Sequence, residues 1–280
     1  MDKDLKGFEL YNIEPNSLHP KARLYTKTIF FNTKNEYKQR LIRVYLPSTY
    51  EFDNPNNRFP VIYMMDGKNL YDDYTSFVGE WGIDETIEEY IERGLSKGYI
   101  VVGIDAPNEN KGRTLEMSFD NVPTVKRFYM GEGYANIFGD YIFETVKPEI
   151  DRTFYTLKDR SNTYVGGSSM GGLMAYYLAS HYPERIEAAL CFSPAFFLLN
   201  QTKLKEFLKI TINKDMPNLF FYVGNIGFEN VFVKSTKMVY EFYKNNLPNL
   251  KVEYIFDENM EHNEYAWRLY FRNALNFIHK

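Results

Sequence analysis

A serine framed by glycines lies in the middle of the chain, at Gly167-Ser168-Ser169-Met170-Gly171. The spacing G-x-S-x-G fits Ser169 alone, because a motif centred on Ser168 would have Met170 in place of its second glycine. In this motif a strand turns sharply into a helix, which leaves the serine hydroxyl exposed as a nucleophile. The N–H of Met170 at the helix start can then donate to a developing oxyanion. The alternative is a tight strand-to-helix turn with a spare serine.

The residues on either side supply the context that this motif requires. Positions 162–166 form a short strand-like run, and positions 173–181 have a helical pattern that closes before Pro183. A strand, a glycine-framed turn and a helix therefore follow one another in the expected order. This context favours a nucleophile over a spare serine.

A serine nucleophile needs a base, and the chain has only 4 histidines. His19 precedes the predicted sheet, His181 ends the helix after the serine, and His279 is the penultimate residue. His262 alone follows a late strand and precedes a helix. The order of serine, acid and histidine resembles that of an α/β-hydrolase. We therefore predict that His262 takes the Ser169 proton; the alternative is a solvated loop histidine.

The acid that would orient the histidine has three candidates. Glu229 is the only carboxylate in the loop 225–230, which follows a strand ending at Gly224. Asp257 and Glu258 lie on the loop of His262 itself, whereas the orienting acid usually comes from the end of the preceding strand. Glu229 could instead be an acid favoured by a helix dipole. We predict Glu229, with Asp257 and Glu258 as alternatives.

A second oxyanion donor is expected from the turn 66–70, which follows the apolar run 60–67. The donor would be a backbone N–H, so the side chain at that position is free to vary. We predict Lys68 as the donor and Asn69 as its neighbour.

The rest of the chain alternates between apolar strand-like runs and helical patterns. Strands are expected at 24–31, 39–46, 60–67, 99–104, 162–166, 186–191, 217–223 and 251–256. Helices are expected at 81–93, 134–150, 173–181, 203–208, 231–245 and 264–279. The alternation predicts an α/β fold whose mostly parallel central sheet carries helices on both faces. Residues 105–133 have no period and are predicted to be a lid or substrate loop.

The composition is that of an ordinary globular protein and excludes several functions. A chain of 280 residues suits one domain over 1–280, and a net charge of -4 provides no basic surface for nucleic acid. The single cysteine, Cys191, excludes an intrachain disulfide and a multi-cysteine metal site. No apolar run is long enough to cross a membrane, so a cytoplasmic protein is expected. Its oligomeric state, including a homo-oligomer, is left open.

Taken together, these features resemble the putative esterase family of α/β-hydrolases. This family includes esterase D, enterochelin and other siderophore esterases, feruloyl and acetyl-xylan esterases, and the mycolyltransferases. The resemblance covers most of the chain and rests on the segments 43–47, 63–70, 79–81, 102–105, 113 with 116, 167–172 and 262–267.

The resemblance implies a role for each residue of the site. Ser169 would be the nucleophile, His262 the base and Glu229 the acid, while Met170 and Lys68 would form the oxyanion hole. The family often places its acid closer to the strand-ending glycine than Glu229 lies to Gly224, so a small insertion is expected in this loop.

Residues that could contact a substrate are less sharply defined. They fall in loops or helix starts that could line a cleft, and they are Asn69, Trp81, Arg113, Glu116, Phe196 and Trp267. Arg113 could hold a substrate carboxylate with its two-pronged guanidinium. A structural role is the alternative for each, because buried aromatics and surface arginines are common.

The function expected from these features is a metal-independent serine carboxylesterase without a cofactor, acting on a small-molecule ester through an acyl-enzyme. Acyl transfer to a sugar or another alcohol would use the same serine. A catalytically silent α/β-hydrolase domain used for binding is the third hypothesis.

Overall fold

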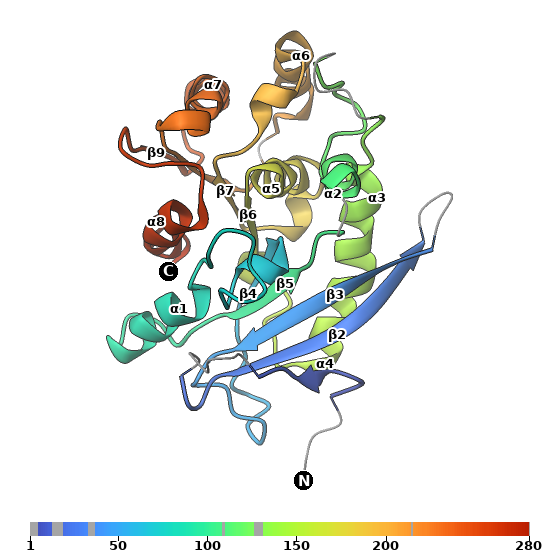
Figure 1. The fold of residues 1–280 in the computed structure, drawn as a ribbon, viewed down its shortest axis with the longest axis vertical. Helices are drawn as coiled ribbons and strands as arrows, with labels where there is room; N and C mark the ends of the chain where they lie inside the picture. The colour runs from blue at the N-terminus through green and yellow to red at the C-terminus, as the bar shows by residue number, and fades with distance from the viewer. Residues whose placement is uncertain are drawn as a thin grey trace.

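The computed structural model describes residues 5–12, 19–32, 37–107, 110–125, 131–213 and 215–279. Within this part of the chain a nine-stranded sheet has the order β1-β2-β3-β5-β4-β6-β7-β8-β9 (Figure 1). The first three strands and β5 pair antiparallel, and all pairs from β5 to β9 are parallel. The mostly parallel sheet predicted from the sequence is therefore confirmed.

The parallel strands β4 to β8 are short, apolar and almost wholly buried, as suits strands covered on both faces. The antiparallel strands are β1 (Glu9–Leu10), β2 (Arg23–Asn32) and β3 (Tyr37–Leu46). The parallel strands are β4 (Val61–Met65), β5 (Ile100–Ile104), β6 (Thr163–Ser168), β7 (Ala188–Phe192), β8 (Asn218–Val223) and β9 (Val252–Phe256).

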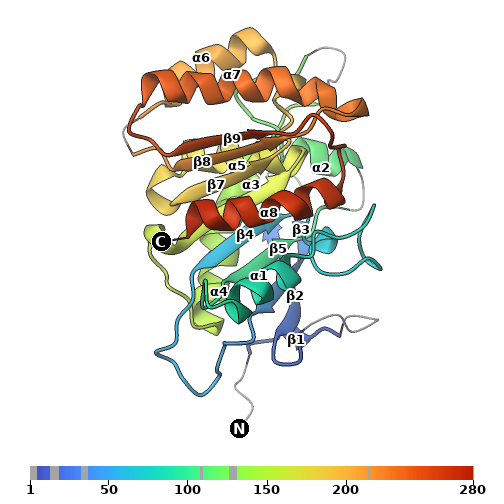
Figure 2. The same cartoon turned by 90° about the vertical axis from the view of Figure 1, so that its left-hand side faces the viewer.

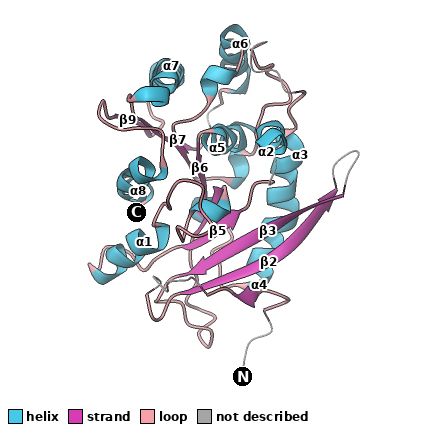
Figure 3. Ribbon diagram, in the orientation of Figure 1, coloured by secondary structure: helices cyan, strands magenta, loops and turns pink. Residues whose placement is uncertain are grey.

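Helices cover both faces of this sheet (Figures 2 and 3). One face is covered by α1 (Ile83–Glu92) and α8 (Glu264–Ile278). The other is covered by α3 (Ala135–Asp140), the π-helical turn η3 (Tyr141–Val146), α4 (Lys147–Thr153), α5 (Met170–His181), α6 (Gln201–Thr211) and α7 (Asn230–Asn246). Alternate residues of a strand enter the two cores, so Val61 and Tyr63 contact one layer while Ile62 contacts the other. None of the described helices is both long and apolar enough to cross a membrane.

The segment 105–133 was predicted to be a loop because its sequence has no period, but it contains the helix α2 (Asn110–Glu116). Residues 108–109 and 126–130 of this segment lie outside the described part. The helix has seven residues and contains Gly112, so periodicity over so short a stretch gives little signal. It is held by tertiary contacts instead: Arg113 forms an ion pair with Asp66, and Glu116 forms one with Arg40.

Phe196 lies in the core, although the sequence placed it among candidate cleft residues. It belongs to the short 3-10 turn η6 (Phe196–Leu198), and its side chain is 0% exposed. Its ring packs 4.9 Å from that of Tyr176 and 6.3 Å from that of Phe221. The residue therefore fills space between the helix after the serine and the sheet.

We expect Phe196→Ala to lower the free energy of unfolding by about 3–5 kcal/mol, because it leaves a cavity among aromatic side chains. Urea denaturation measures this change. Ile210→Ala is the control, since Ile210 is 81% exposed and its loss should change stability little. Equal stability of the two variants would contradict a core role for Phe196.

Candidate active site

Ser169 sits between β6 and α5 in a backbone conformation that non-glycine residues rarely adopt, with φ 58° and ψ −116°. Its N–H donates to the Phe192 carbonyl at 2.9 Å, and its carbonyl accepts from Leu173 at 3.0 Å and from Ala195 at 3.0 Å. These bonds to β7, to the loop after it and to α5 hold the strained turn in place. The serine is thereby fixed at the carboxyl end of β6.

The glycines of the motif are required by close approach. A Cβ on Gly167 would lie 2.8 Å from the carbonyl carbon of Gly171, and one on Gly171 would lie 2.9 Å from the Cβ of Met65. A Cβ on Gly172 would meet the Phe192 carbonyl oxygen at 2.7 Å. Separations this short do not occur in relaxed structures, so larger residues would push the turn away from β4 and β7.

The structure brings Glu229 and His262 together. Nδ1 of His262 forms a short hydrogen bond with Oε2 of Glu229, whose side chain is fully buried. Because Nδ1 is engaged by the carboxylate, Nε2 is the ring nitrogen left for a proton from another group. The imidazole stacks on Phe232 with 4.4 Å between ring centroids and meets Trp267 edge-on at 5.0 Å.

The loop around Glu229 folds its carboxylate back onto the sheet. Residues Gly227–Glu229 form the 3-10 turn η7, with Gly227 at φ +60°. The turn brings the Glu229 carboxylate back toward the end of β8, where the N–H of Gly224 donates to Oε1 at 2.8 Å. The carboxylate thus lies against the end of β8, although Glu229 follows Gly224 by five residues.

Ser193 is a part of this network that the sequence did not reveal. Its hydroxyl donates to Oε1 of Glu229 and accepts from the indole N–H of Trp267 at 3.0 Å. It also has a positive φ of 43°, directly after β7. Its position in the sequence could have indicated it, because Ser193 follows a buried strand at the carboxyl edge of the sheet, where ligands bind in such folds.

The alternative acids point elsewhere. Asp257 accepts from the Tyr270 hydroxyl and from the N–H of Asn259 at 2.9 Å. The Tyr270 bond, helped by that of Asn259, lowers the pKa of Asp257, so this carboxylate is ionised but is engaged by Tyr270. Glu258 is exposed.

The turn after β4 carries Lys68 in the 3-10 helix η1 (Gly67–Asn69). Asp66, just before it, has φ 60°, and its carboxylate is held by Arg113 through two bonds of 2.6 Å. Burial alone would lower the pKa of Arg113, but the charge and the hydrogen bonds of Asp66 together outweigh burial, and the pKa is raised. Arg113, which was predicted to hold a substrate carboxylate through two hydrogen bonds, therefore holds the Asp66 carboxylate in this way.

Ser169, His262 and Lys68 line one cavity of about 290 Å³. Its other lining residues are Asp66, Asn69, Phe77, Val78, Ala106, Pro107, Arg113, Ser168, Glu264 and Trp267. Met170 follows Ser169 as the first residue of α5, so its N–H has no acceptor within the helix. The cavity thus contains a serine, a histidine paired with a carboxylate, and a helix N-terminus beside the serine.

Three of the residues proposed to contact a substrate are not among those that line this cavity. Glu116 is fully buried and paired with Arg40 and Lys38. Trp81 is 2% exposed and packs against Phe192 at 4.9 Å and Trp267 at 5.6 Å. Phe196 is the third, in the core as described above. Aromatic and charged residues near a strand end can pack beneath a cavity instead of lining it. Their position in the sequence does not distinguish the two cases.

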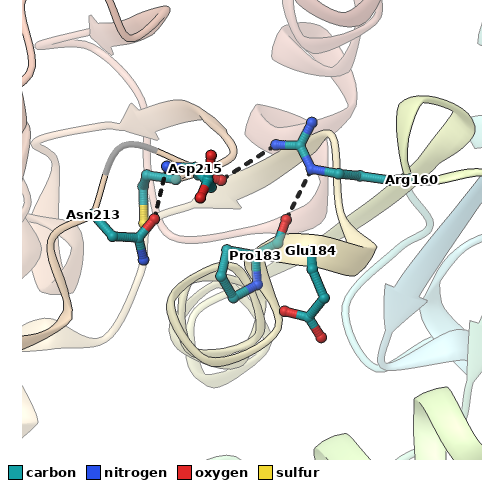
Figure 4. A pocket seen from close by; sticks show the side chains of 6 residues that line it. Arg160, Pro183, Glu184, Asn213 and Asp215 are labelled. Atoms are coloured by element: carbon teal, nitrogen blue, oxygen red, sulfur yellow. Dashed lines mark hydrogen bonds between the residues drawn. The ribbon is translucent and has the colours of Figure 1, made fainter.

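Another cavity, of about 640 Å³, is lined by the six residues drawn in Figure 4. Its lining residues precede β6 and β8 or follow α5, so they surround the amino ends of the strands. Arg160 is already engaged there, since it donates to the Pro183 carbonyl at 2.9 Å and to Glu187 at 2.9 Å. This cavity is larger than the one at Ser169, but its Arg160 is engaged by the protein, and it lies at the opposite ends of the strands.

Among the residues that line the cavity at Ser169, Glu264 has a strongly altered pKa. It begins α8 and accepts from the Asn69 side chain at 3.3 Å. Burial raises the pKa of Glu264 to about 7, and the negative charge of Asp66 adds to the effect. A carboxyl group with a raised pKa in the folded state binds its proton more tightly there than in the unfolded chain. Its stabilising contribution is complete below about pH 4.5 and is lost as the pH rises through about 7.

We therefore expect Glu264→Gln, which stays neutral, to be more stable than the wild type at pH 8. The difference in the free energy of unfolding should shrink as the pH falls toward about 4.5. Denaturation across this pH range measures it. Glu261→Gln removes the same charge at an exposed position and controls for net charge. A stability difference that does not change with pH would contradict the assignment.

Comparison with known proteins places this arrangement in context. A siderophore triacetylfusarinine C esterase of Aspergillus fumigatus is 27% identical over 205 residues, which make up 70% of this chain and 66% of the relative. An endo-1,4-beta-xylanase/feruloyl esterase of Xylanibacter ruminicola is 25% identical over 158 residues, which cover 56% of this chain but 20% of the relative. The chain thus matches less than two thirds of the length of each of these relatives.

Solved structures support the fold. The siderophore hydrolase EstB from Aspergillus nidulans superposes with a TM-score of 0.68 at 20% identity, covering 93% of this chain and 96% of that chain. The predicted α/β-hydrolase fold is confirmed by this likeness. The family described as putative esterase matches residues 35–212, which is more than half of the chain. The chain belongs to the putative esterase family.

Proposed function

We propose that this protein is a serine carboxylesterase that hydrolyses an acyl ester through a covalent acyl-enzyme on Ser169. The observation that carries the proposal is the cavity shared by Ser169 and His262, with Glu229 bonded to the far side of the imidazole. Membership of the esterase family supports the same reaction class. The strained turn at Ser169 also matches the way nucleophiles are presented in this fold.

Each residue has a defined part in the reaction. The Ser169 oxygen attacks the ester carbonyl carbon while Nε2 of His262 takes its proton. The carbonyl oxygen becomes an oxyanion, which accepts from the N–H groups of Met170 and Lys68. Glu229 keeps the imidazole in the correct tautomer and stabilises the imidazolium. The tetrahedral intermediate then collapses, and the C–O bond to the alcohol breaks as His262 protonates the leaving oxygen.

The second half of the reaction reverses these roles with water. His262 removes a proton from water, and the resulting hydroxide attacks the acyl carbon. A second oxyanion forms in the same place, the bond to Ser169 breaks, and the serine regains its proton from His262. The carboxylic acid leaves, and no metal or cofactor takes part in these steps.

The walls of the cavity indicate where the substrate lies. Phe77 and Val78 are 81% and 58% exposed, so their apolar surfaces are available to an acyl or aromatic group at the mouth. Trp267 lies deeper, beside His262. We propose an ester with an apolar or aromatic acyl part, in keeping with the siderophore and feruloyl esters named for the two relatives.

A fluorophosphonate probe tests the nucleophile directly. We expect one label per chain in the wild type and none in Ser169→Ala, because only an activated serine reacts. Ser180→Ala, at the other end of α5, should be labelled like the wild type, since its hydroxyl is bonded to the Tyr177 carbonyl at 2.8 Å. A folded wild type without label would contradict the proposal and favour a binding domain.

Hydrolysis of p-nitrophenyl esters from acetate to octanoate tests the other two residues. We expect His262→Ala to lower kcat by about 10⁴-fold or more, because the serine loses its base. Glu229→Gln should lower kcat by about 10²–10⁴-fold, since the imidazole loses its orienting charge.

Asp257→Asn is the matched control for Glu229→Gln and should retain near-normal turnover, because Asp257 bonds Tyr270 rather than His262. A large loss in Asp257→Asn with none in Glu229→Gln would transfer the role of the acid to Asp257. Near-normal turnover in His262→Ala would refute the mechanism.

A further inference from the structure

Three acidic side chains converge beside Trp81, outside the cavity of Ser169. Glu80 precedes the tryptophan, and Asp84 and Glu85 lie in the first turn of α1. One carboxylate oxygen from each residue lies within 4.8 Å of the other two. Like charges so close repel one another strongly unless something compensates them.

The Asp84 side chain shows that the protein itself does not provide this compensation. Asp84 is 1% exposed, and apart from its own backbone N–H and the neighbouring Glu85 carboxyl its oxygens have no hydrogen-bond partner. Oε2 of Glu80 and Oε2 of Glu85 are likewise buried without a partner. Buried polar atoms are usually satisfied in folded proteins. Four buried carboxylate oxygens that no cationic or amide donor satisfies therefore lie together, where they are available to a cation.

Arg268 is the nearest cation, and it faces the other side of the cluster. Its guanidinium lies 3.7 Å from Oε1 of Glu80 and 3.8 Å from Oε1 of Glu85, which is too far for a hydrogen bond. These are the opposite oxygens from those left unpartnered. Arg268 thus provides one positive charge at the periphery of a cluster of three carboxyl groups.

The donor set selects the kind of cation. All available ligand atoms are carboxylate oxygens, which hard divalent cations prefer. Mg²⁺ is usually held through one or two carboxylates and keeps several of its waters, whereas Ca²⁺ accepts more oxygen ligands from the protein. A set of three carboxylates therefore suits Ca²⁺. We propose that Glu80, Asp84 and Glu85 bind one Ca²⁺ ion, with water completing its coordination.

The position of this site gives it a structural role. The N–H of Trp81 donates to the Asn69 carbonyl at 2.9 Å, and that of Ile83 donates to Leu70 at 3.3 Å. The acidic cluster thus flanks the segment that supports the turn of Lys68. The ion would hold α1 to this segment, whatever reaction the cavity performs.

Calorimetric titration of the chelator-treated full chain with CaCl₂ tests the proposal. We expect one Ca²⁺ per wild-type chain and a thermal midpoint that rises with CaCl₂ more than with equal MgCl₂. Asp84→Asn should bind at least tenfold more weakly. Glu92→Gln, an exposed acid at the end of the same helix, should bind like the wild type.

Two outcomes would overturn the proposal. One is a wild type that is folded by circular dichroism yet takes up no Ca²⁺ at millimolar concentration, which would assign the neutralisation to protons. The other is unchanged Ca²⁺ binding in Asp84→Asn. If that variant does not fold, Glu85→Gln replaces it, because the Glu85 side chain is 34% exposed and tolerates the change. Unchanged binding there would overturn the proposal equally.

Discussion

The buried carboxylate of Glu229 is the constraint on which the site depends. A fully buried charge is stable only when hydrogen bonds replace the water it has lost. Here the donors come from three separate places: the end of β8 through Gly224, the end of β7 through Ser193, and the loop after β9 through His262. The hydrogen bonds to the Glu229 carboxylate therefore fix the ends of β7, β8 and β9 relative to one another. The same bonds set the direction of the imidazole, so stability and site geometry have a common origin.

On the other side of the cavity, the Asp66–Arg113 ion pair has a similar effect on the turn of Lys68. Asp66 adopts a left-handed backbone conformation, which an aspartate tolerates better than most residues but which still needs support. Two short bonds from α2 provide it. The turn after β4 and the helix after β5 are thereby joined, although 47 residues separate them along the chain. Raised-energy conformations at Asp66, Ser169 and Ser193 all lie at the carboxyl edge of the sheet.

Much of the fold could be predicted because its signals are local. The buried strands are continuous apolar runs, and the glycines around Ser169 mark the sharp turn directly. Glu229 and His262 were predicted as site residues from their positions after β8 and β9, and the structure pairs their side chains. What could not be predicted depends on contacts between distant segments: the helix α2, whose stability comes from Asp66 and Arg40, and the hydroxyl of Ser193, whose partners are 36 and 74 residues away. Burial of Glu116 and Phe196 is also a tertiary property that residue type does not reveal.

The link between α2 and the turn of Lys68 has a mechanical consequence. Residues 105–107 leave β5 beside the cavity, and α2 is tied to the body of the protein by Arg113 and Glu116. Further along, the Val125 N–H donates to the Leu198 carbonyl at 2.8 Å. An outward movement of α2 would displace Asp66 or separate a buried ion pair. Widening the mouth would therefore also displace the backbone of Lys68, so under the proposed mechanism a larger substrate would be admitted only by disturbing the proposed oxyanion hole.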